Sequence, residues 1–109
     1  MSEMAFDIRT DDADPGRIAL AGELDLSAVP FLEEVVELAL LDPRVEIVVL
    51  DMAQATFLDS SALGALVRGR RAATAGGRRF VVVNANGHVR RVLDITGVAE
   101  TLTADGAGR

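Results

Sequence analysis

The chain has 109 residues, half of them hydrophobic, and its formal net charge at pH 7 is −6. This length supplies one compact core and is short for two ordinary domains, so we expect a single domain over residues 1–109. The acidic charge disfavours nucleic acid as a partner, because binding its backbone relies on clustered lysine and arginine. No stretch approaches about 18 consecutive apolar residues, which predicts no membrane insertion.

Two further features bear on location and chemistry. The chain has no cysteine, so it can form no disulfide, thiolate nucleophile or cysteine-ligated metal site. Its first residues include acids where a secretory signal would carry lysine and an apolar run. We therefore expect a cytoplasmic location and no redox chemistry.

Five arginines are concentrated in one part of the chain: Arg68, Arg70, Arg71, Arg78 and Arg79. Aromatic residues make up only 4% of the chain, so it lacks the stacking side chains that single-stranded nucleic-acid sites use. We interpret these arginines as a solvated helix face and the turn after it, which could receive an acidic partner.

The first part of the chain has the pattern of a β-hairpin. Ala5–Arg9 alternates in polarity, an acidic turn follows over Asp11–Gly16, and Arg17–Ala21 forms a second apolar run. Alternation that is interrupted by a turn containing proline and glycine is typical of two paired strands.

The next segment has helical periodicity. Its apolar residues recur three or four positions apart from residue 32 to residue 40, and its acids fall on the other side. Ser27 is a candidate cap, and Pro30 is tolerated in a first turn because early amides need no helical acceptor. Asp42-Pro43 ends the predicted helix.

Five more elements follow in chain order, each recognised by its apolar pattern and flanking breakers. They are a buried strand over Val45–Leu50, a helix over Ser60–Ala75 closed by Gly76-Gly77, a buried strand over Phe80–Val83, a short helix around Val89–Leu93 closed by Gly97, and an edge strand over Glu100–Thr103.

The order of these elements predicts an α/β fold. Strands that alternate with helices form a mostly parallel sheet, and the initial hairpin adds an antiparallel strand, so the sheet is mixed. We expect four to five strands with helices packed on them, a core over about residues 5–103, and a frayed tail over residues 104–109.

The segment from Phe57 to Gly64 joins a strand to a helix. Its Asp59-Ser60-Ser61 sequence is typical of an N-cap, because a helix start exposes amides that a carboxylate or hydroxyl can satisfy. If Ser60 is the cap, its hydroxyl points back at those amides. If Asp59 is the cap, Ser60 occupies the first helical position with an outward hydroxyl, which another protein can phosphorylate.

Two glycines, Gly64 and Gly69, lie inside the same predicted helix. Each costs about 1 kcal/mol relative to alanine, so something should offset that cost. Close packing of the helix on the sheet is one explanation, and close approach of a partner's backbone is the other.

Three blocks stand out along the chain. They are Gly22-Glu23-Leu24-Asp25, Asp59-Ser60-Ser61-Ala62-Leu63-Gly64 and Val89-Arg90-Arg91-Val92-Leu93-Asp94-Ile95-Thr96-Gly97-Val98. Together, in this order and at these spacings, they resemble anti-sigma factor antagonists, whose shared module is the sulfate transporter and anti-sigma antagonist (STAS) domain. The resemblance covers residues 5–103.

This resemblance implies partner switching in transcription regulation. In the family, the unphosphorylated antagonist binds an anti-sigma factor kinase and so frees a sigma factor; the kinase phosphorylates the antagonist with ATP, and a phosphatase restores it. The family's phosphoacceptor serine falls on Ser60, with Ser61 as the second choice. The implied partner-binding residues are Asp25, Asp59, Ser60, Ser61, Ala62 and Gly64.

One position departs from the family pattern, which usually has glycine where this chain has Ala62. Alanine is small and favours helix formation, so we expect the fold to tolerate it. Its methyl group bears on how closely a kinase approaches the helix.

The alternative is a non-switching STAS subunit of a lipid-transport or stress-signalling complex. An enzyme is not expected, because the chain has no glycine-rich phosphate-binding motif and its one histidine, His88, is predicted to be solvated at a helix start. No cofactor or metal site is predicted, and weak nucleotide binding is a minor alternative without a motif.

Overall fold

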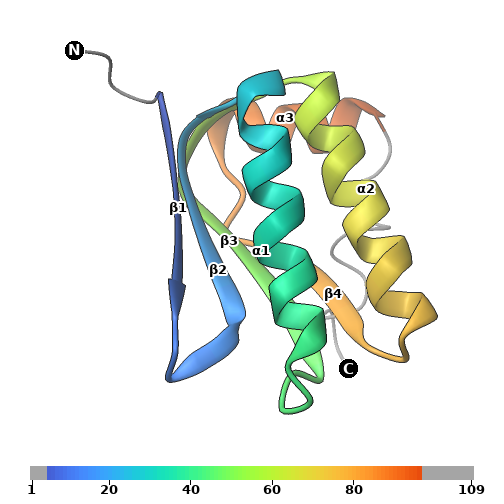
Figure 1. The fold of residues 1–109 in the computed structure, drawn as a ribbon. Helices are drawn as coiled ribbons and strands as arrows, with labels where there is room; N and C mark the ends of the chain where they lie inside the picture. Colours follow the sequence, from blue (N-terminus) through green and yellow to red (C-terminus); the bar gives the residue numbers. More distant parts are fainter. Residues whose placement is uncertain (1–4, 97–109) are drawn as a thin grey trace.

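The computed structural model describes residues 5–96, which form a four-stranded sheet covered by helices (Figure 1). The strands are β1 (Phe6–Asp11), β2 (Asp14–Leu24), β3 (Ile47–Leu58) and β4 (Arg79–Val83), in that order across the sheet. β1 pairs antiparallel with β2, and the other two pairings are parallel. The predicted α/β fold, with a mixed sheet that opens with a hairpin, is thus confirmed. The predicted strand over Glu100–Thr103, the helix end at Gly97 and the predicted tail over residues 104–109 lie outside the described residues.

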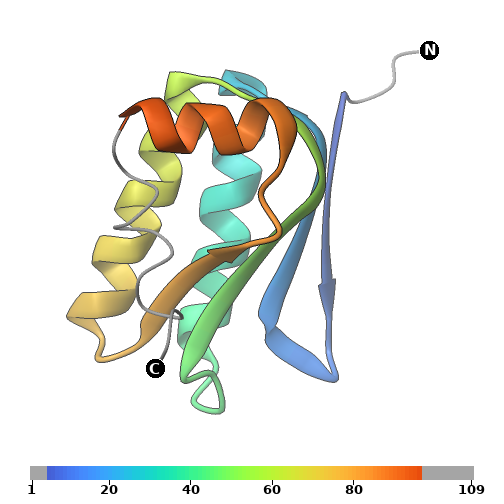
Figure 2. The same ribbon diagram turned by 180° about the vertical axis from the view of Figure 1, so that it is seen from behind.

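The helices are the short 3-10 helix η1 (Leu26–Ala28), α1 (Val29–Leu41), α2 (Ser60–Ala75) and α3 (Gly87–Thr96). α1 and α2 lie side by side on one face of the sheet, and α3 crosses behind them at the end where β2 and β3 finish (Figures 1 and 2). α2 has the bounds predicted from the sequence, and Gly77, with a φ of 76°, follows it as expected.

The hairpin turn is shorter than the predicted Asp11–Gly16. The carboxylate of Asp11 accepts a hydrogen bond from the backbone N–H of Ala13 at 2.9 Å, which tightens the turn, and β2 begins at Asp14. Residues 15–17 are accommodated by a shift in the register between β1 and β2. Gly16 therefore lies in the strand, where an added Cβ would come within 2.4 Å of the carbonyl oxygen of Ile47.

The predicted capping role of Ser27 is wrong. The carboxylate of Asp25 accepts hydrogen bonds from the backbone N–H of Ser27, at 3.0 Å, and from its hydroxyl. Asp25 therefore caps η1, which leads directly into α1. Ser27 lies within the first turn because the chain begins to coil before Pro30. The predicted helix end at Asp42 is confirmed.

β3 is much longer than the predicted strand over Val45–Leu50, with 12 residues. Its buried residues Leu50, Met52, Ala55 and Leu58 depart from strict alternation, and its pairing with β2 shifts register twice. Such shifts hide the two-residue period by which a strand is recognised in a sequence. The extension carries β3 to the residue before Asp59, next to the start of α2.

The hydrophobic core lies between the sheet and the two helices α1 and α2. It includes Ile18, Leu20, Val48, Leu50, Leu66 and Phe80, all at most 1% exposed. α2 approaches this core closely at Gly69, where an added Cβ would lie 3.1 Å from the ring of Phe80. Close packing on the sheet, one of the two predicted explanations, therefore accounts for Gly69.

Three of the five arginines, Arg68, Arg71 and Arg79, are exposed, as the predicted solvated face requires. Arg68 and Arg78 also make specific contacts with α1. Arg68 forms an ion pair with Glu33, at 3.1 Å between Nη2 and Oε2. Arg78 donates from Nη1 to the carbonyl oxygen of Leu40 at 2.7 Å. Both contacts join residues that are more than 30 positions apart, which no local pattern reveals.

Candidate functional site

Asp59 is the N-cap of α2. Its carboxylate accepts a hydrogen bond from the backbone N–H of Ala62 at 2.9 Å, and its carbonyl accepts the first helical bond, from Leu63, at 2.9 Å. Its backbone is extended, with φ −97° and ψ 178°, as an N-cap requires. Of the two cap assignments open from the sequence, the structure therefore selects Asp59.

Ser60 consequently occupies the first position of α2. It is exposed, whereas Ser61 is half-buried and Ala62 is fully buried in the core. A partner that approaches this helix start thus meets Ser60 first. The methyl group of Ala62 is covered by other residues, so the partner does not contact it directly.

Asp25 lies at the same edge of the sheet as Asp59. The two residues follow neighbouring parallel strands, in which Leu24 pairs with Leu58, and the backbone N–H of Asp59 donates to the carbonyl of Leu24 at 3.1 Å. η1 and the start of α2 accordingly lie together at one end of the molecule (Figure 1). The hydrogen bonds from Ser27 lower the pKa of Asp25, which keeps its carboxylate ionised.

The glycine of the first sequence block has a structural role in this arrangement. Gly22 has a φ of 82°, and an added Cβ would come within 2.1 Å of the carbonyl oxygen of Ala5. That carbonyl accepts a hydrogen bond from the backbone N–H of Glu23 at 2.8 Å. Only glycine fits this close approach at positive φ, so Gly22 holds β1 against the end of β2 just before Asp25.

Gly64 lies one turn into α2 from Ser60 and is half-exposed. An added Cβ there would come within 3.1 Å of Nη1 of Arg68, and the sheet does not approach it within 4 Å. Packing on the sheet therefore explains Gly69 but does not explain Gly64.

The STAS domain sequence model matches residues 7–105. The chain belongs to the STAS domain family. A search of curated proteins gives no match. The three sequence blocks that suggested the family thus fall within a match that spans almost the whole chain.

Solved structures with the same fold include the anti-sigma factor antagonist SpoIIAA in its unphosphorylated form, at 24% identity and a TM-score of 0.68, covering 87% of this chain and 83% of that chain. The phosphorylated form of the Bacillus cell fate determinant SpoIIAA has 22% identity, a TM-score of 0.64, and coverages of 91% and 88%. TM1081 of Thermotoga maritima has 22% identity, a TM-score of 0.69, and coverages of 90% and 83%. These likenesses establish the fold of this STAS domain.

Beside the start of α2, this STAS domain carries an aromatic pair that the sequence did not indicate. The rings of Phe57 and His88 are stacked, with centroids 4.8 Å apart and an interplanar angle of 15°. His88 is exposed at the start of α3, as predicted, but it also packs on Phe57, and its Nε2 lies 3.4 Å from the carbonyl oxygen of Leu58. The sequence could have indicated Phe57 only through the alternation of side chains along β3. Because Leu58 is buried, its neighbour Phe57 faces away from the core.

The part of this STAS domain that the structure describes contains no group of three or more histidine, cysteine, aspartate or glutamate side chains arranged to hold a metal ion. Across residues 5–96, none of the helices is both long enough and apolar enough to span a membrane.

Proposed function

We propose that this chain is an anti-sigma factor antagonist that binds an anti-sigma factor kinase in its unphosphorylated form, frees a sigma factor, and is inactivated by phosphorylation on Ser60. The observation that carries the proposal is the cap: because Asp59 satisfies the helix amides, Ser60 is exposed at the first position of α2. A serine that is not needed as a cap is available to a kinase.

The charge around Ser60 explains how a phosphate would act. A phosphoserine adds about −1.5 to −2 charges at pH 7. The carboxylates of Asp59 and Asp25 lie at the same edge of the sheet, so the modified surface would combine three anionic groups. A partner that fits the unmodified surface would be expelled by repulsion and by the cost of desolvating the phosphate, without a change of fold.

The fold comparisons support this proposal in one further respect. SpoIIAA, which shares the fold, is known in an unphosphorylated and a phosphorylated form. For this chain we propose the same kind of modification, a kinase and a phosphatase as its protein partners, a cytoplasmic location, and no catalytic activity of its own.

Phosphorylation is tested by isolating the kinase that binds the chain, incubating the two with ATP, and mapping the modified peptides by mass spectrometry. We expect one phosphate on Ser60. Ser60→Ala should abolish it, while Ser61→Ala, the matched control on the next residue, should leave it in place. Recovery of a transporter ATPase in place of a kinase as the binding partner, with no phosphate on Ser60 or Ser61, would overturn the proposal.

The charge mechanism has its own test. Ser60→Glu should weaken binding to the kinase at least tenfold in calorimetry, because a carboxylate reproduces part of the phosphate charge. Ser60→Ala should bind as the unaltered chain does. Equal affinities for all three proteins would reject charge repulsion as the cause of release.

A further inference from the structure

Arg68 lies on α2 eight residues after Ser60, with Gly64 midway between them. Residues four apart on a helix are neighbours, with Cβ atoms about 5–6 Å apart, and helical side chains lean toward the N-terminus of the helix. Arg68 can therefore extend along α2 toward Gly64 and Ser60.

The guanidinium of Arg68 lies against Gly64, which is half-exposed. A Cβ added at Gly64 would lie 3.1 Å from Nη1 of Arg68, which, within residues 5–96, is its nearest contact outside the backbone of α2. Glycine thus leaves room for this side chain. Gly64 and Ser60 are in turn one helical step apart, with Cβ positions about 5–6 Å from each other, so the guanidinium reaches the neighbour of Ser60 on this face of α2.

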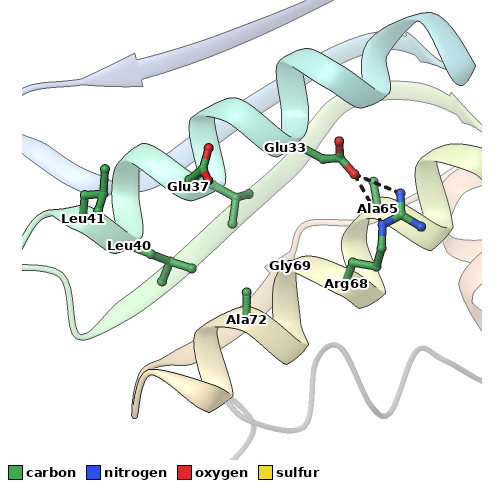
Figure 3. A pocket seen from close by; sticks show the side chains of 9 residues that line it. Glu33, Glu37, Leu40, Leu41, Ala65, Arg68, Gly69 and Ala72 are labelled. Atoms are coloured by element: carbon green, nitrogen blue, oxygen red, sulfur yellow. Dashed lines mark hydrogen bonds and ion pairs between the residues drawn. The ribbon is translucent and has the colours of Figure 1, made fainter.

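Glu33 of α1 holds this guanidinium at present. Nε and Nη2 of Arg68 donate to Oε2 of Glu33 at 3.3 and 3.1 Å, at one end of a groove of about 440 Å³ between α1 and α2 (Figure 3). The side chains of Arg68 and Glu33 are 56% and 51% exposed. An ion pair this exposed contributes little to stability, so a stronger anion can displace the carboxylate at low cost.

We propose that Arg68 binds the phosphate of phosphorylated Ser60 and releases Glu33. This inference rests on the proposed phosphorylation of Ser60. A phosphoserine presents three strong acceptor oxygens, and the planar arginine fork can donate to two of them at once. The phosphate would extend from Ser60 along α2 toward Gly64. A change in the Arg68 rotamer would bring the guanidinium to the phosphate there.

This exchange changes the shape of the site as well as its charge. With the phosphate joined to the guanidinium over Gly64, the part of this surface that Arg68 now leaves exposed would be covered. Loss of the Glu33 ion pair also removes a contact between α1 and α2. A partner whose backbone approaches α2 at Gly64 would meet both effects at once.

The test uses the full chain with phosphoserine placed at position 60 during translation, so that it depends on no kinase. Titration by phosphorus-31 NMR gives the second pKa of the phosphate. We expect this pKa to be lower in the otherwise unaltered chain than in Arg68→Gln by roughly half a unit, because a nearby cation favours the dianion. Arg68→Lys should fall between them. Asp59 and Asp25 are present in every variant and raise the phosphate pKa alike, so the differences report Arg68.

Arg71→Gln is the matched control, since it removes a positive charge from α2 one turn farther from Ser60 and should leave the phosphate pKa unchanged. The Nε–Hε signal of Arg68 in proton–nitrogen NMR spectra should shift on phosphorylation in the unaltered chain. Glu33→Gln should reproduce the loss of the ion pair and keep the low phosphate pKa.

The proposal is overturned if Arg68→Gln and the unaltered chain have the same phosphate pKa, or if the Arg68 signal does not move. A kinase that leaves Ser60 unmodified would instead contradict the proposed function. The NMR result does not depend on that outcome, so the two failures are distinguishable.

Discussion

The two ends of the α1–α2 layer differ in their packing: one end is closely packed, and the other leaves polar groups exposed. The site end comprises the residues at the ends of η1 and α2 nearest the strand ends: Asp25, Asp59, Ser60 and Gly64. The packed end comprises Gly69, farther along α2, together with Asp42 just after α1 and Arg78 in the turn after α2. At the packed end, Gly69 fits against the ring of Phe80, and Arg78 donates to carbonyls at the end of α1. At the site end, capping carboxylates satisfy the helix starts and leave Ser60 exposed.

The two glycines of α2 make this difference plain. They lie five residues apart on one helix and carry the same intrinsic cost to helix formation. At Gly69 the space for a side chain is filled by a core ring, whereas at Gly64 it is filled only by the flexible end of Arg68. The structural role of a glycine in a helix therefore depends on the surface that lies opposite it.

The largest effect is expected at the packed end. Gly69→Val should lower the free energy of unfolding by about 2 kcal/mol, because the new side chain overlaps the ring of Phe80 in a filled core. Urea denaturation measures it. Gly64→Val is the matched control, with the same change in helix propensity but only Arg68 to displace. An equal loss at both positions would contradict the distinction between the two ends.

A smaller loss is expected at the site end when the cap is removed. Asp59→Ala should lower the free energy of unfolding by about 1 kcal/mol, because the N–H of Ala62 loses its acceptor. Asp59→Asn retains an acceptor oxygen and should lose much less. If Asp59→Asn lowers the free energy of unfolding as much as Asp59→Ala does in the same denaturation experiment, Asp59 stabilises the fold through its charge and not through its hydrogen bond to Ala62.

Gly64→Ala should change stability by less than about 0.5 kcal/mol in either direction, because better helix propensity is offset by crowding of Arg68. Its effect should instead be on binding. If the kinase backbone approaches α2 here, its affinity should fall severalfold in calorimetry, with an unchanged melting temperature. An unchanged affinity would show that the partner contacts the site end without approaching Gly64.

The smallest effect is a pH dependence at the packed end. Hydrogen bonds from Arg44 are the main cause that lowers the pKa of Asp42 to about 2. A carboxyl with a folded pKa below its unfolded value of about 3.9 stabilises the fold above that value, and the contribution is lost as the pH falls through the folded pKa. Between about pH 4 and pH 2, the melting temperature should fall less in Asp42→Asn than in the unaltered chain. Parallel curves would contradict this.

The sequence by itself determined the features that depend on near neighbours. The bounds of α2 follow from the capping sequence Asp59-Ser60-Ser61 at its start and from Gly76-Gly77 at its end, and the apolar pattern of β4 marks that strand within one residue. A cap, a breaker or a helical period is formed by residues a few positions apart, so the sequence contains the whole signal. The order of these elements was then sufficient to predict the mixed sheet.

Only the tertiary structure decided the features that join distant residues. The extension of β3, the pairing of Leu24 with Leu58 that brings Asp25 to Asp59, the stacking of His88 on Phe57 and the ion pair of Arg68 with Glu33 each join positions 30 or more apart. Register and packing also decided the local choices that the sequence left open, because Asp59 and Ser60 were both plausible caps. The energy of such contacts resides in surfaces that meet only when the chain has folded.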